Sequence, residues 1–497
     1  MTAAACLLLA ATFTRPMERV VSMDPLLAQS IYDSHAIQLV YETPLEVDYE
    51  ARPYRLVPGL CALPEVSADG LVYTFRLVPR EPMVVKAPDV VRCLKRLQDP
   101  ANASPGGWTM KDVASFEVVD EGTFVIRLRN RSHVFPWMMA MSYAAVVASD
   151  GSGTGPYRLT SWRKNHEMLF ERNPAWPGWA TRPDAFDAVR YLVVGDVSTQ
   201  WLMFLKNEVD LLGEVSRDNW DAVVTPEGGL DPRLEAEGVR LFGSENLQIR
   251  YIGMNMRDPL LGSNRKLRQA LSCAFDFPTW KRFMNNRVEF SDGPVPRGVE
   301  GHLDEPPPYS FDLERAKRLL AEAGYPGGID PQTGRRLAVT LSIGRVDGRE
   351  DGELLASFYE KIGVKLELSF STWGAFLKAV DEGRVQLYMM GWVGDYPDAE
   401  NFLQLFYSKN RSPGPNHSCY ANDEFDRSFE AAMAADSAEV RNAHWRRCQE
   451  IVREDCPWIF THFPKSYTIV RPTVKNYIPG DFPYGQEKNL RHEDAGN

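Results

Sequence analysis

The feature that most constrains this chain is a strand, helix and strand pattern between residues 364 and 392. Val364–Phe370 alternates polar and apolar side chains as a strand does, and Val385–Trp392 forms a second apolar run. Between them, Thr372 is placed to cap a helix that ends at Gly383. Two strands joined by one helix form a parallel crossover, so the pattern predicts an α/β fold class.

The length of the chain predicts more than one domain. At 497 residues, with 44% hydrophobic and 25% charged residues, it is too long for a single hydrophobic core. A second α/β region begins near residue 247, where Asn246–Asn255 is strand-like. The net charge of −11 disfavours a nucleic-acid partner, which needs a basic face to neutralise phosphates.

Periodicity and capping residues predict the remaining elements. Alternation predicts strands at Leu7–Thr14, Thr123–Leu128, Trp162–Arg172, Val189–Val194 and Trp458–His462, and a hairpin at Asp69-Gly70. Helices are predicted from Pro88, at 198–207, 267–276, after Asp312, at 352–362, 423–435 and 439–455. Asp436 and Glu439 stand in capping-box spacing at the start of the last helix.

The cysteines and the N-terminus bear on the cellular compartment. Seven cysteines are dispersed with no C-x-x-C pair, so we expect buried free thiols and no disulfide. Ala3–Phe13 is apolar enough for the core of a signal peptide but lacks a basic segment before it. Cys6 is a weak candidate for lipid attachment, because only five residues precede it.

The strongest candidate for a functional site is Gly391–Asp398, where a buried strand breaks into an acidic turn. Gly391 and Gly394 leave backbone N–H and C=O groups open to close approach, and Asp395 stands at the exit of the strand. A carboxylate there can receive a cationic group, while an exposed strand edge can pair with the backbone of a ligand. The alternative is an aspartate that caps a helix or stabilises a turn.

Seven segments in order along the chain resemble one family. They are Ser22-Met23-Asp24-Pro25, Tyr41-Glu42-Thr43-Pro44-Leu45, Asp69-Gly70 with Tyr73-Thr74-Phe75, Gly153-Thr154-Gly155-Pro156-Tyr157, Ala316 to Gly328, Gly391 to Asp398, and Asn422-Asp423-Glu424-Phe425-Asp426. Each is weak alone, but together they make the chain similar to the family 5 periplasmic solute-binding proteins. These are the dipeptide- and oligopeptide-binding components of ABC importers.

The resemblance implies a two-lobed α/β receptor of the periplasmic-binding-protein fold, which closes about a hinge on a ligand between its lobes. We expect lobe I at residues 1–246 and 466–497, with an extra subdomain at about 48–152, and lobe II at 247–465. Two segments depart from the family, Arg80–Lys86 and a shortened Met141–Gly151. Both lie in or beside the extra subdomain.

The resemblance also implies roles for individual residues. Asp395 matches the aspartate that pairs with the α-ammonium of a peptide, and Gly391, Trp392 and Val393 match the strand that pairs with its backbone. Trp373 matches a tryptophan that walls a side-chain pocket, although Trp373 and Trp392 could equally be core residues. Arg345 matches the arginine that holds the free carboxylate of a dipeptide, with Arg349 as competitor and a surface arginine as the alternative. In lobe I, the backbone of Gln29, Ser30 and Ile31 matches the other edge of the site.

We therefore expect a receptor that delivers short peptides to the permease subunits of an ABC importer. It should act as a monomer, without a cofactor or nucleic acid, and the eight histidines show no metal-ligand spacing. The alternatives are a receptor for another solute (an opine, glutathione, a metal complex or a sugar) and a cytoplasmic solute sensor. An enzyme is disfavoured, because Gly-x-Ser-x-Gly, His-Glu-x-x-His and Walker motifs are lacking.

The same resemblance bears on export. In the family a first strand precedes the segment that matches Ser22–Pro25 by about ten residues, which places Leu7–Thr14 on that strand. Cleavage of a signal peptide there would remove part of the fold. We therefore expect a periplasmic or otherwise exported protein whose recorded start lies downstream of the true export signal. A chain that stays in the cytoplasm is the alternative.

Overall fold

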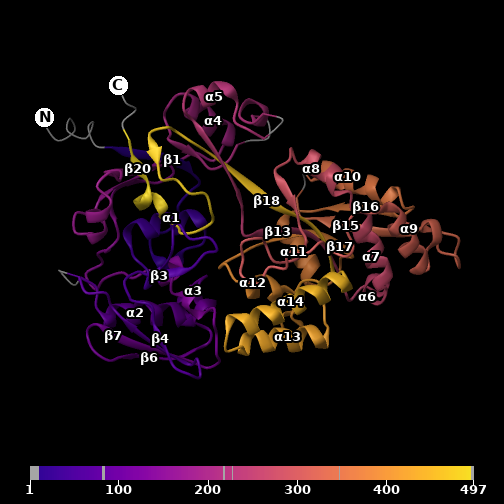
Figure 1. Ribbon diagram of the computed structural model, residues 1–497, viewed down its shortest axis with the longest axis horizontal. Helices are drawn as coiled ribbons and strands as arrows, with labels where there is room; N and C mark the ends of the chain where they lie inside the picture. The colour runs from indigo at the N-terminus through magenta and orange to yellow at the C-terminus, as the bar shows by residue number, and fades with distance from the viewer. Residues whose placement is uncertain are drawn as a thin grey trace. The chain divides into compact units, whose positions relative to one another are not determined.

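The computed structural model describes residues 11–80, 84–215, 219–225, 228–345, 348–412 and 414–493 (Figure 1). The chain divides into two compact units. Unit 1 consists of Met1–Ser244 and Ser466–Asn497, and unit 2 of Glu245–Lys465. Among the helices that the structure describes, none combines the length and the apolar character that a bilayer crossing requires. The six described cysteines are all free and buried, whereas Cys6 lies outside the described residues.

Unit 1 contains two four-stranded sheets. The first has the order β1-β10-β9-β8, and its strands are β1 (Thr12–Met17), β10 (Ala188–Val193), β9 (Glu167–Arg172) and β8 (Tyr157–Arg163). Strand β1 is parallel to β10, whereas β10 and β9, and β9 and β8, pair antiparallel. The second is antiparallel, in the order β4 (Glu65–Val66), β5 (Val72–Arg76), β7 (Thr123–Leu128) and β6 (Val113–Val118). Its β4 and β5 are joined at Gly70, whose φ of 69° confirms the predicted Asp69-Gly70 hairpin.

Short strands and five α-helices complete the described part of unit 1. The strands are β2 (Leu45–Val47), β3 (Leu56–Pro58), β11 (Leu211–Leu212), β12 (Arg240–Glu245), β19 (Val474–Lys475) and β20 (Arg491–His492). The helices are α1 (Ile31–Val40), α2 (Ala87–Gln98), α3 (Phe135–Met138), α4 (Val197–Leu205) and α5 (Pro232–Ala236). Gly155 shows why a glycine-rich turn precedes β8. Its N–H donates to the Val40 carbonyl at 2.9 Å, and a Cβ there would lie 2.6 Å from that same oxygen.

Two strand predictions in unit 1 are corrected by the structure. The first strand is Thr12–Met17 and not Leu7–Thr14, of which residues 7–10 lie outside the described residues. Pro16 made this segment a poor strand in the sequence, but β1 is an edge strand, where a missing N–H is tolerated. The predicted single strand Trp162–Arg172 is the hairpin of β8 and β9, which turns at Asn165 with a φ of 61°. Asparagine adopts this left-handed conformation more readily than most residues do.

The sheet of unit 2 has the strand order β18-β13-β17-β15-β16, and β14 (Val288–Phe290) also pairs with β18. Its strands are β13 (Gln248–Met254), β15 (Ala338–Ile343), β16 (Lys365–Phe370), β17 (Leu387–Val393) and β18 (Trp458–Val470). Since β15 lies parallel to both β16 and β17, the predicted parallel crossover is confirmed. In contrast, β13 is antiparallel to β17.

Strand β18 is much longer than the predicted Trp458–His462. Pro464 and Lys465 interrupt the apolar pattern, but Thr468, Ile469 and Val470 resume it. The first part of the strand pairs with β13 and β14, and its end pairs with β11 in unit 1. β18 is therefore a continuous strand that leads from unit 2 into unit 1 (Figure 1).

Unit 2 carries nine described α-helices, and most begin at a capping side chain. They are α6 (Pro259–Ser263), α7 (Arg265–Ala274), α8 (Phe277–Phe283), α9 (Leu313–Glu322), α10 (Arg349–Glu360), α11 (Trp373–Asp381), α12 (Ala399–Leu403), α13 (Asp423–Ala434) and α14 (Ala438–Asp455). The predicted Asp312 cap is confirmed by the hydrogen bond that it accepts from the Arg315 N–H at 2.9 Å. The predicted Asp436 cap is wrong, because the Ser437 side chain caps α14. Thr372 occupies the predicted N-cap position of α11, but its side chain makes no capping hydrogen bond.

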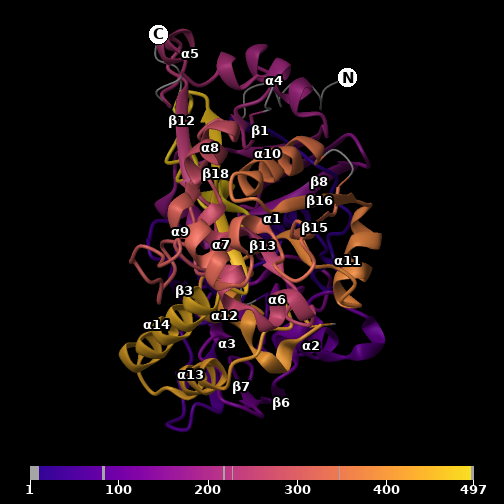
Figure 2. The ribbon, with the colours of Figure 1, turned by 90° about the vertical axis from the view of Figure 1, so that its right-hand side faces the viewer.

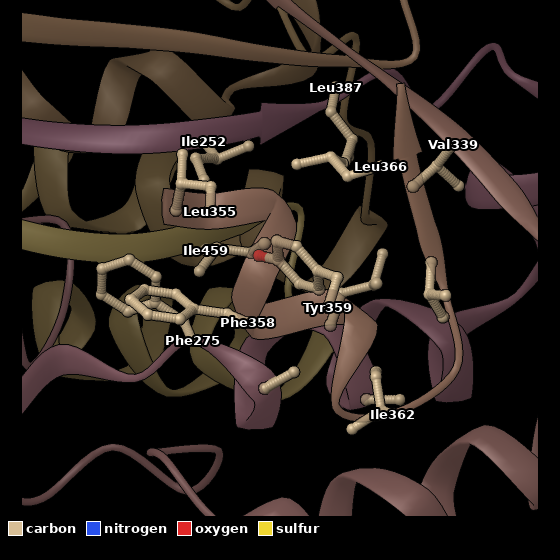
Figure 3. Packing of buried hydrophobic residues seen from close by; sticks show 14 of the residues in the cluster. Ile252, Phe275, Val339, Leu355, Phe358, Tyr359, Ile362, Leu366, Leu387 and Ile459 are labelled. Carbon is tan, nitrogen blue, oxygen red and sulfur yellow. The ribbon is translucent and has the colours of Figure 1, made fainter. Parts of the chain in front are cut away.

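A hydrophobic core fixes the sheet of unit 2 between its helices (Figure 3). Phe275 and Phe358 meet edge to face with ring centroids 6.0 Å apart, and Tyr359 lies beside them. Leu387 of β17 and Ile459 of β18 belong to the same cluster and are almost completely buried. Helices α13 and α14 pack against each other (Figures 1 and 2). The start of β17 is thus held rigidly, which defines the direction in which its end projects.

Candidate ligand-binding site

One edge of β17 is open at its C-terminal end. On one side, β13 pairs with the whole strand, from Leu387 opposite Met254 to Val393 opposite Gln248. On the other side, β15 pairs only with Leu387, Tyr388 and Met389. Within the described part of the chain, no strand pairs with β17 beyond Met389 on that side. Residues 390–393 therefore present a free strand edge at the place where the sequence predicts one.

The backbone groups that face this edge belong to Gly391 and Val393. The Gly394 N–H donates to the Leu247 carbonyl at 2.6 Å, so Gly394 is oriented towards the chain of β13. Successive residues of a strand direct their N–H and C=O groups to opposite sides. Gly391 and Val393 consequently direct theirs away from β13, and the side chain of Val393 is 52% exposed. Their contact with a ligand remains a prediction.

Asn401 holds Trp392 and Asp395 in place and was missed in the sequence. The Trp392 Nε1–H donates to Asn401 Oδ1 at 2.8 Å, and the Asp395 backbone N–H donates to the same oxygen at 3.2 Å. The Asn401 amide nitrogen then donates to Asp395 Oδ2 at 3.4 Å. Because an indole can only donate, these contacts assign the orientation of the Asn401 amide. Its place three residues after Asp398, within the first turn of α12, is the signal that could have identified it.

Asp395 is an exposed carboxylate with no cationic partner in the described part of the chain. Partial desolvation by the surrounding protein raises its pKa, while the hydrogen bond from Asn401 acts in the opposite direction. The capping role considered for Asp395 is performed instead by Asp398, which accepts from the Glu400 N–H at 2.9 Å. Asp395 is thus placed beside the open edge without a structural task of its own.

Trp373 is not a core residue. Its side chain is 56% exposed, whereas Phe376 and Val380 on the same helix are buried. The indole stacks on Phe376 with ring centroids 5.4 Å apart and lies against Gly344, where a Cβ would stand 2.9 Å from it. Since Gly344 directly follows β15, Trp373 lies at the end of the strand that neighbours the open edge of β17.

Arg345 also follows β15, but its charge is partly compensated. Its guanidinium forms an ion pair with Asp351, and its side chain is 53% exposed. The competitor Arg349 is more exposed and stands 3.4 Å from Glu353, one turn along α10. The structure therefore brings Arg345 to the end of the sheet where Trp373 lies, and Arg349 remains a surface residue.

Gln29, Ser30 and Ile31 lie in unit 1 at the start of α1. The buried Asp33 carboxylate accepts hydrogen bonds from the N–H groups of Gln29 at 3.0 Å and Ser30 at 3.2 Å. It also accepts from the N–H groups of Val21 and Ser22. The N–H groups of Gln29 and Ser30, which belong to the backbone that the resemblance assigned to a ligand, are thus engaged within unit 1.

Unit 2 also brings together Asp292, His302 and Asp304, which the spacing of the histidines did not suggest. Each offers one possible metal-ligand atom, and the three atoms lie within 4.8 Å of one another. However, Asp292 Oδ2 is already 3.2 Å from the Arg297 guanidinium, which supplies the positive charge that a cation would bring. The cluster is therefore explained by its own ion pair.

A cavity in unit 1 has none of the predicted site residues in its lining. It has a volume of about 740 Å³ and is lined by Tyr41, Arg80, Ser152, Thr154 and Arg158, among others. Arg80 is engaged in an ion pair with Glu42 at 2.5 Å.

Comparisons with known proteins identify relatives along most of the chain. It is 25% identical over 481 residues to heme-binding protein A of Haemophilus influenzae, which covers 88% of this chain and 84% of that protein. It is 23% identical over 495 residues to the dipeptide-binding protein of Escherichia coli, with 90% and 88% covered.

Solved structures confirm the two-lobed α/β fold. HbpA2 from Haemophilus parasuis matches with a TM-score of 0.83 at 23% identity, over 97% of this chain and all of that one. The periplasmic binding protein DppA from Helicobacter pylori, in complex with the peptide STSA, matches with a TM-score of 0.75 at 22% identity, over 97% and 98% of the two chains. The family model of bacterial extracellular solute-binding proteins, family 5, matches residues 55–414. The chain belongs to this family.

Proposed function

We propose that this protein is the solute receptor of an ABC importer and that it binds short peptides. It acts outside the cytoplasm as a monomer, delivers its ligand to permease subunits and catalyses no reaction. Lobe I comprises residues 1–246 and 466–497, with the extra subdomain at about 48–152, and lobe II comprises 247–465. The compact units of the chain and the four-stranded sheet of β4 to β7 support this division.

The observation that carries the proposal is that an open strand edge and a carboxylate without a cationic partner occur next to each other in the chain. Gly391 and Val393 offer backbone donors and acceptors in a row, and Asp395 follows at the end of that row. An extended peptide has the same backbone pattern whatever its side chains, so pairing along an edge accepts many sequences. The amino terminus supplies the cation that Asp395 lacks.

The names of the relatives support peptides as the ligand class. Besides the dipeptide-binding protein of Escherichia coli, the chain is 23% identical over 465 residues to di/tripeptide-binding protein 2 of Pseudomonas aeruginosa. Trp373, exposed at the end of the neighbouring strand, supplies an apolar wall for a ligand side chain. Arg345 stands at the same end of the sheet and supplies a positive charge.

Isothermal titration calorimetry with di- to pentapeptides and their N-acetylated forms tests the ligand and its anchor together. Acetylation removes the positive charge of the amino terminus and leaves the rest of the peptide backbone unchanged. We expect it to weaken binding by about 2 to 5 kcal/mol, because the Asp395 carboxylate then loses its partner. Equal affinities of free and acetylated peptides would contradict the role of Asp395.

The substitution Asp395→Asn provides the complementary test. It should weaken free-amine peptides strongly and acetylated peptides little, since the amide has no charge to pair with the ammonium. Asp423→Asn is the matched control, because Asp423 is an exposed aspartate in the first turn of α13 and does not belong to the candidate site. A loss of affinity that is equal in both variants would count against a specific anchor.

Export is tested in cells. The protein, expressed from its native gene region, should be released with the osmotic-shock fraction while a cytoplasmic marker is retained. Retention with the marker would support the cytoplasmic solute sensor. Binding of sugars, opines or metal complexes in the same calorimetric screen, without peptide binding, would support the alternative solute receptor.

A further inference from the structure

Arg250 of β13 is a cation without a carboxylate partner. It is half-buried, and none of the described ion pairs includes it. Its guanidinium makes one hydrogen bond, from Nη2 to Gln248 Oε1, and that bond is long at 3.4 Å. A partly desolvated charge that lacks a counter-ion is costly, and most folds pair such a group or expose it fully.

The charged and titratable groups around Arg250 do not compensate it. Arg345 is close enough to act on it as a like charge, and burial also lowers the pKa of Arg250. His462, opposite Arg250 on β18, is neutral at physiological pH because burial lowers its pKa to about 3. Tyr251 is buried and uncharged, since burial raises its pKa well above the ordinary value. The region is therefore positive and open to an anion.

Gly391 allows the guanidinium to extend towards the open edge of β17. Arg250 and Gly391 are directly opposite in the register of β13 and β17. Side chains of opposite residues lie on the same face of a sheet, and Gly391 has none. A Cβ at position 391 would overlap the Arg250 guanidinium, so that group lies across the glycine. Beyond Gly391 on this face comes the free edge.

A strand added at this edge would place a side chain next to Arg250. The residue opposite Gly391 projects to the same face as the Arg250 side chain, because directly paired residues share a face. We propose that Arg250 binds a carboxylate of the ligand and makes this protein selective for peptides that place a carboxylate opposite Gly391. This inference rests on the proposed function and names the ligand class of the same site.

Arg250 differs from Arg345 in having no carboxylate of its own. Arg345 is paired with Asp351, whereas the fold leaves Arg250 to a carboxylate from outside. Asp395 follows Gly391 by four residues, so at about 3.3 Å per residue the backbone positions of Asp395 and Gly391 are at most about 13 Å apart. The edge therefore presents a negative and a positive anchor at a separation that a short zwitterionic peptide spans.

The carboxylate can be an acidic side chain or the free C-terminus, and calorimetry on the wild-type protein separates these sources. The probes are Ala-Glu-Ala and Ala-Gln-Ala, each as the free acid and as the C-terminal amide. If a side chain is bound, the Glu peptide binds about 10- to 100-fold more tightly than the Gln peptide in both forms. If the C-terminus is bound, the acids bind more tightly than the amides by a similar factor. Equal affinities across all four peptides overturn the inference.

Arg250→Gln should abolish whichever preference the wild type shows, and Arg250→Lys should retain part of it, since a lysine keeps the charge and loses the two-pronged geometry. Arg318→Gln, an exposed arginine on α9, is the matched control and should leave the preference unchanged. If Arg250→Gln keeps the preference while N-acetylation still abolishes binding, the role of Arg250 is wrong and the proposed function stands. If no peptide binds the wild-type protein, both are wrong.

Discussion

Two aspartates, Asp33 in unit 1 and Asp395 in unit 2, stand next to segments that the sequence marked as ligand-binding. The Asp33 carboxylate is buried and accepts four backbone N–H groups, two of them from Gln29 and Ser30. Asp395 is exposed and receives one side-chain hydrogen bond, from Asn401. In the first region the fold satisfies its own polar groups, and in the second it leaves a charge and a strand edge unsatisfied.

The comparison teaches that residue type and position in a motif do not separate structural from functional carboxylates. A buried carboxylate with several N–H donors is a fixed part of the folded state, and its removal strands those donors. An exposed carboxylate with few partners contributes little to stability and is available for a ligand. The same distinction separates Arg345, which has Asp351, from Arg250, which has no acidic partner among the described residues.

The largest expected effect is that of Asp33→Ala on stability. The substitution leaves four backbone donors near the start of α1 without their acceptor, and we expect a loss of about 3 kcal/mol in the free energy of unfolding. Urea denaturation followed by tryptophan fluorescence measures it. Glu65→Ala, at an exposed ion pair with Arg76, is the control and should cost much less than Asp33→Ala, because exposed ion pairs contribute little to stability. A similar small loss for Asp33→Ala would break the contrast between the two regions.

The next effect is that of Gly391→Ala, which tests the open edge. The new Cβ would overlap the flexible Arg250 guanidinium and stand 2.8 Å from the Ile249 carbonyl, which belongs to the backbone and cannot move aside. We expect a loss of about 1 to 3 kcal/mol in stability and a displaced Arg250 that binds anionic peptides less well. The control Gly374→Ala, in α11 with open space around it, should be neutral or stabilising by up to about 1 kcal/mol.

The smallest expected effect on stability is that of Asp395→Asn, which should stay within about 0.5 kcal/mol of the wild type. Because the pKa of Asp395 is raised in the folded state, that state binds a proton more readily than the unfolded chain. Its contribution to stability therefore falls as the pH rises from the unfolded pKa through the raised folded pKa, and the variant lacks this slope. Thermal unfolding at a series of pH values measures it.

Peptide binding should depend on pH in the opposite direction. Only the ionised Asp395 pairs with an ammonium, so affinity should rise as the pH passes upward through the raised pKa. Calorimetry at several pH values on the wild type and on Asp395→Asn separates the effect of Asp395 ionisation on affinity from the effect of titrating the peptide itself. If the wild-type affinity does not change over this pH range, Asp395 does not bind the peptide, and the contrast with Asp33 does not hold.

The sequence predicted regular elements well where periodicity and caps agreed. Strands β7 and β16 and helices α9 and α13 lie within one or two residues of the predicted ranges. The failures have local causes. Asn165 turned one predicted strand into a hairpin, Pro464 concealed the continuation of β18, and Pro16 concealed an edge strand. In each case a residue that usually ends a strand occupies a position where the tertiary structure tolerates it.

The candidate site was predictable only in part. The glycines and Asp395 stand in one segment, so the sequence alone suggested a strand edge with a carboxylate. Asn401 and Arg250 were not suggested. Asn401 reaches from α12 back to Trp392 and Asp395 and bonds to both. Arg250 lies beside the open edge only because strand register places it opposite Gly391, which is 141 residues away in the chain.

The sequence by itself determined the α/β class, the family and the position of the acidic turn, because these depend on local periodicity and on motifs within one segment. The tertiary structure decided which polar groups remain available. Whether a carboxylate or a guanidinium has a partner depends on strand register and on side chains distant in the chain, as Asp33 and Arg250 show. Local sequence cannot encode that outcome, because the partners are brought together only by the packing of the sheet and its helices.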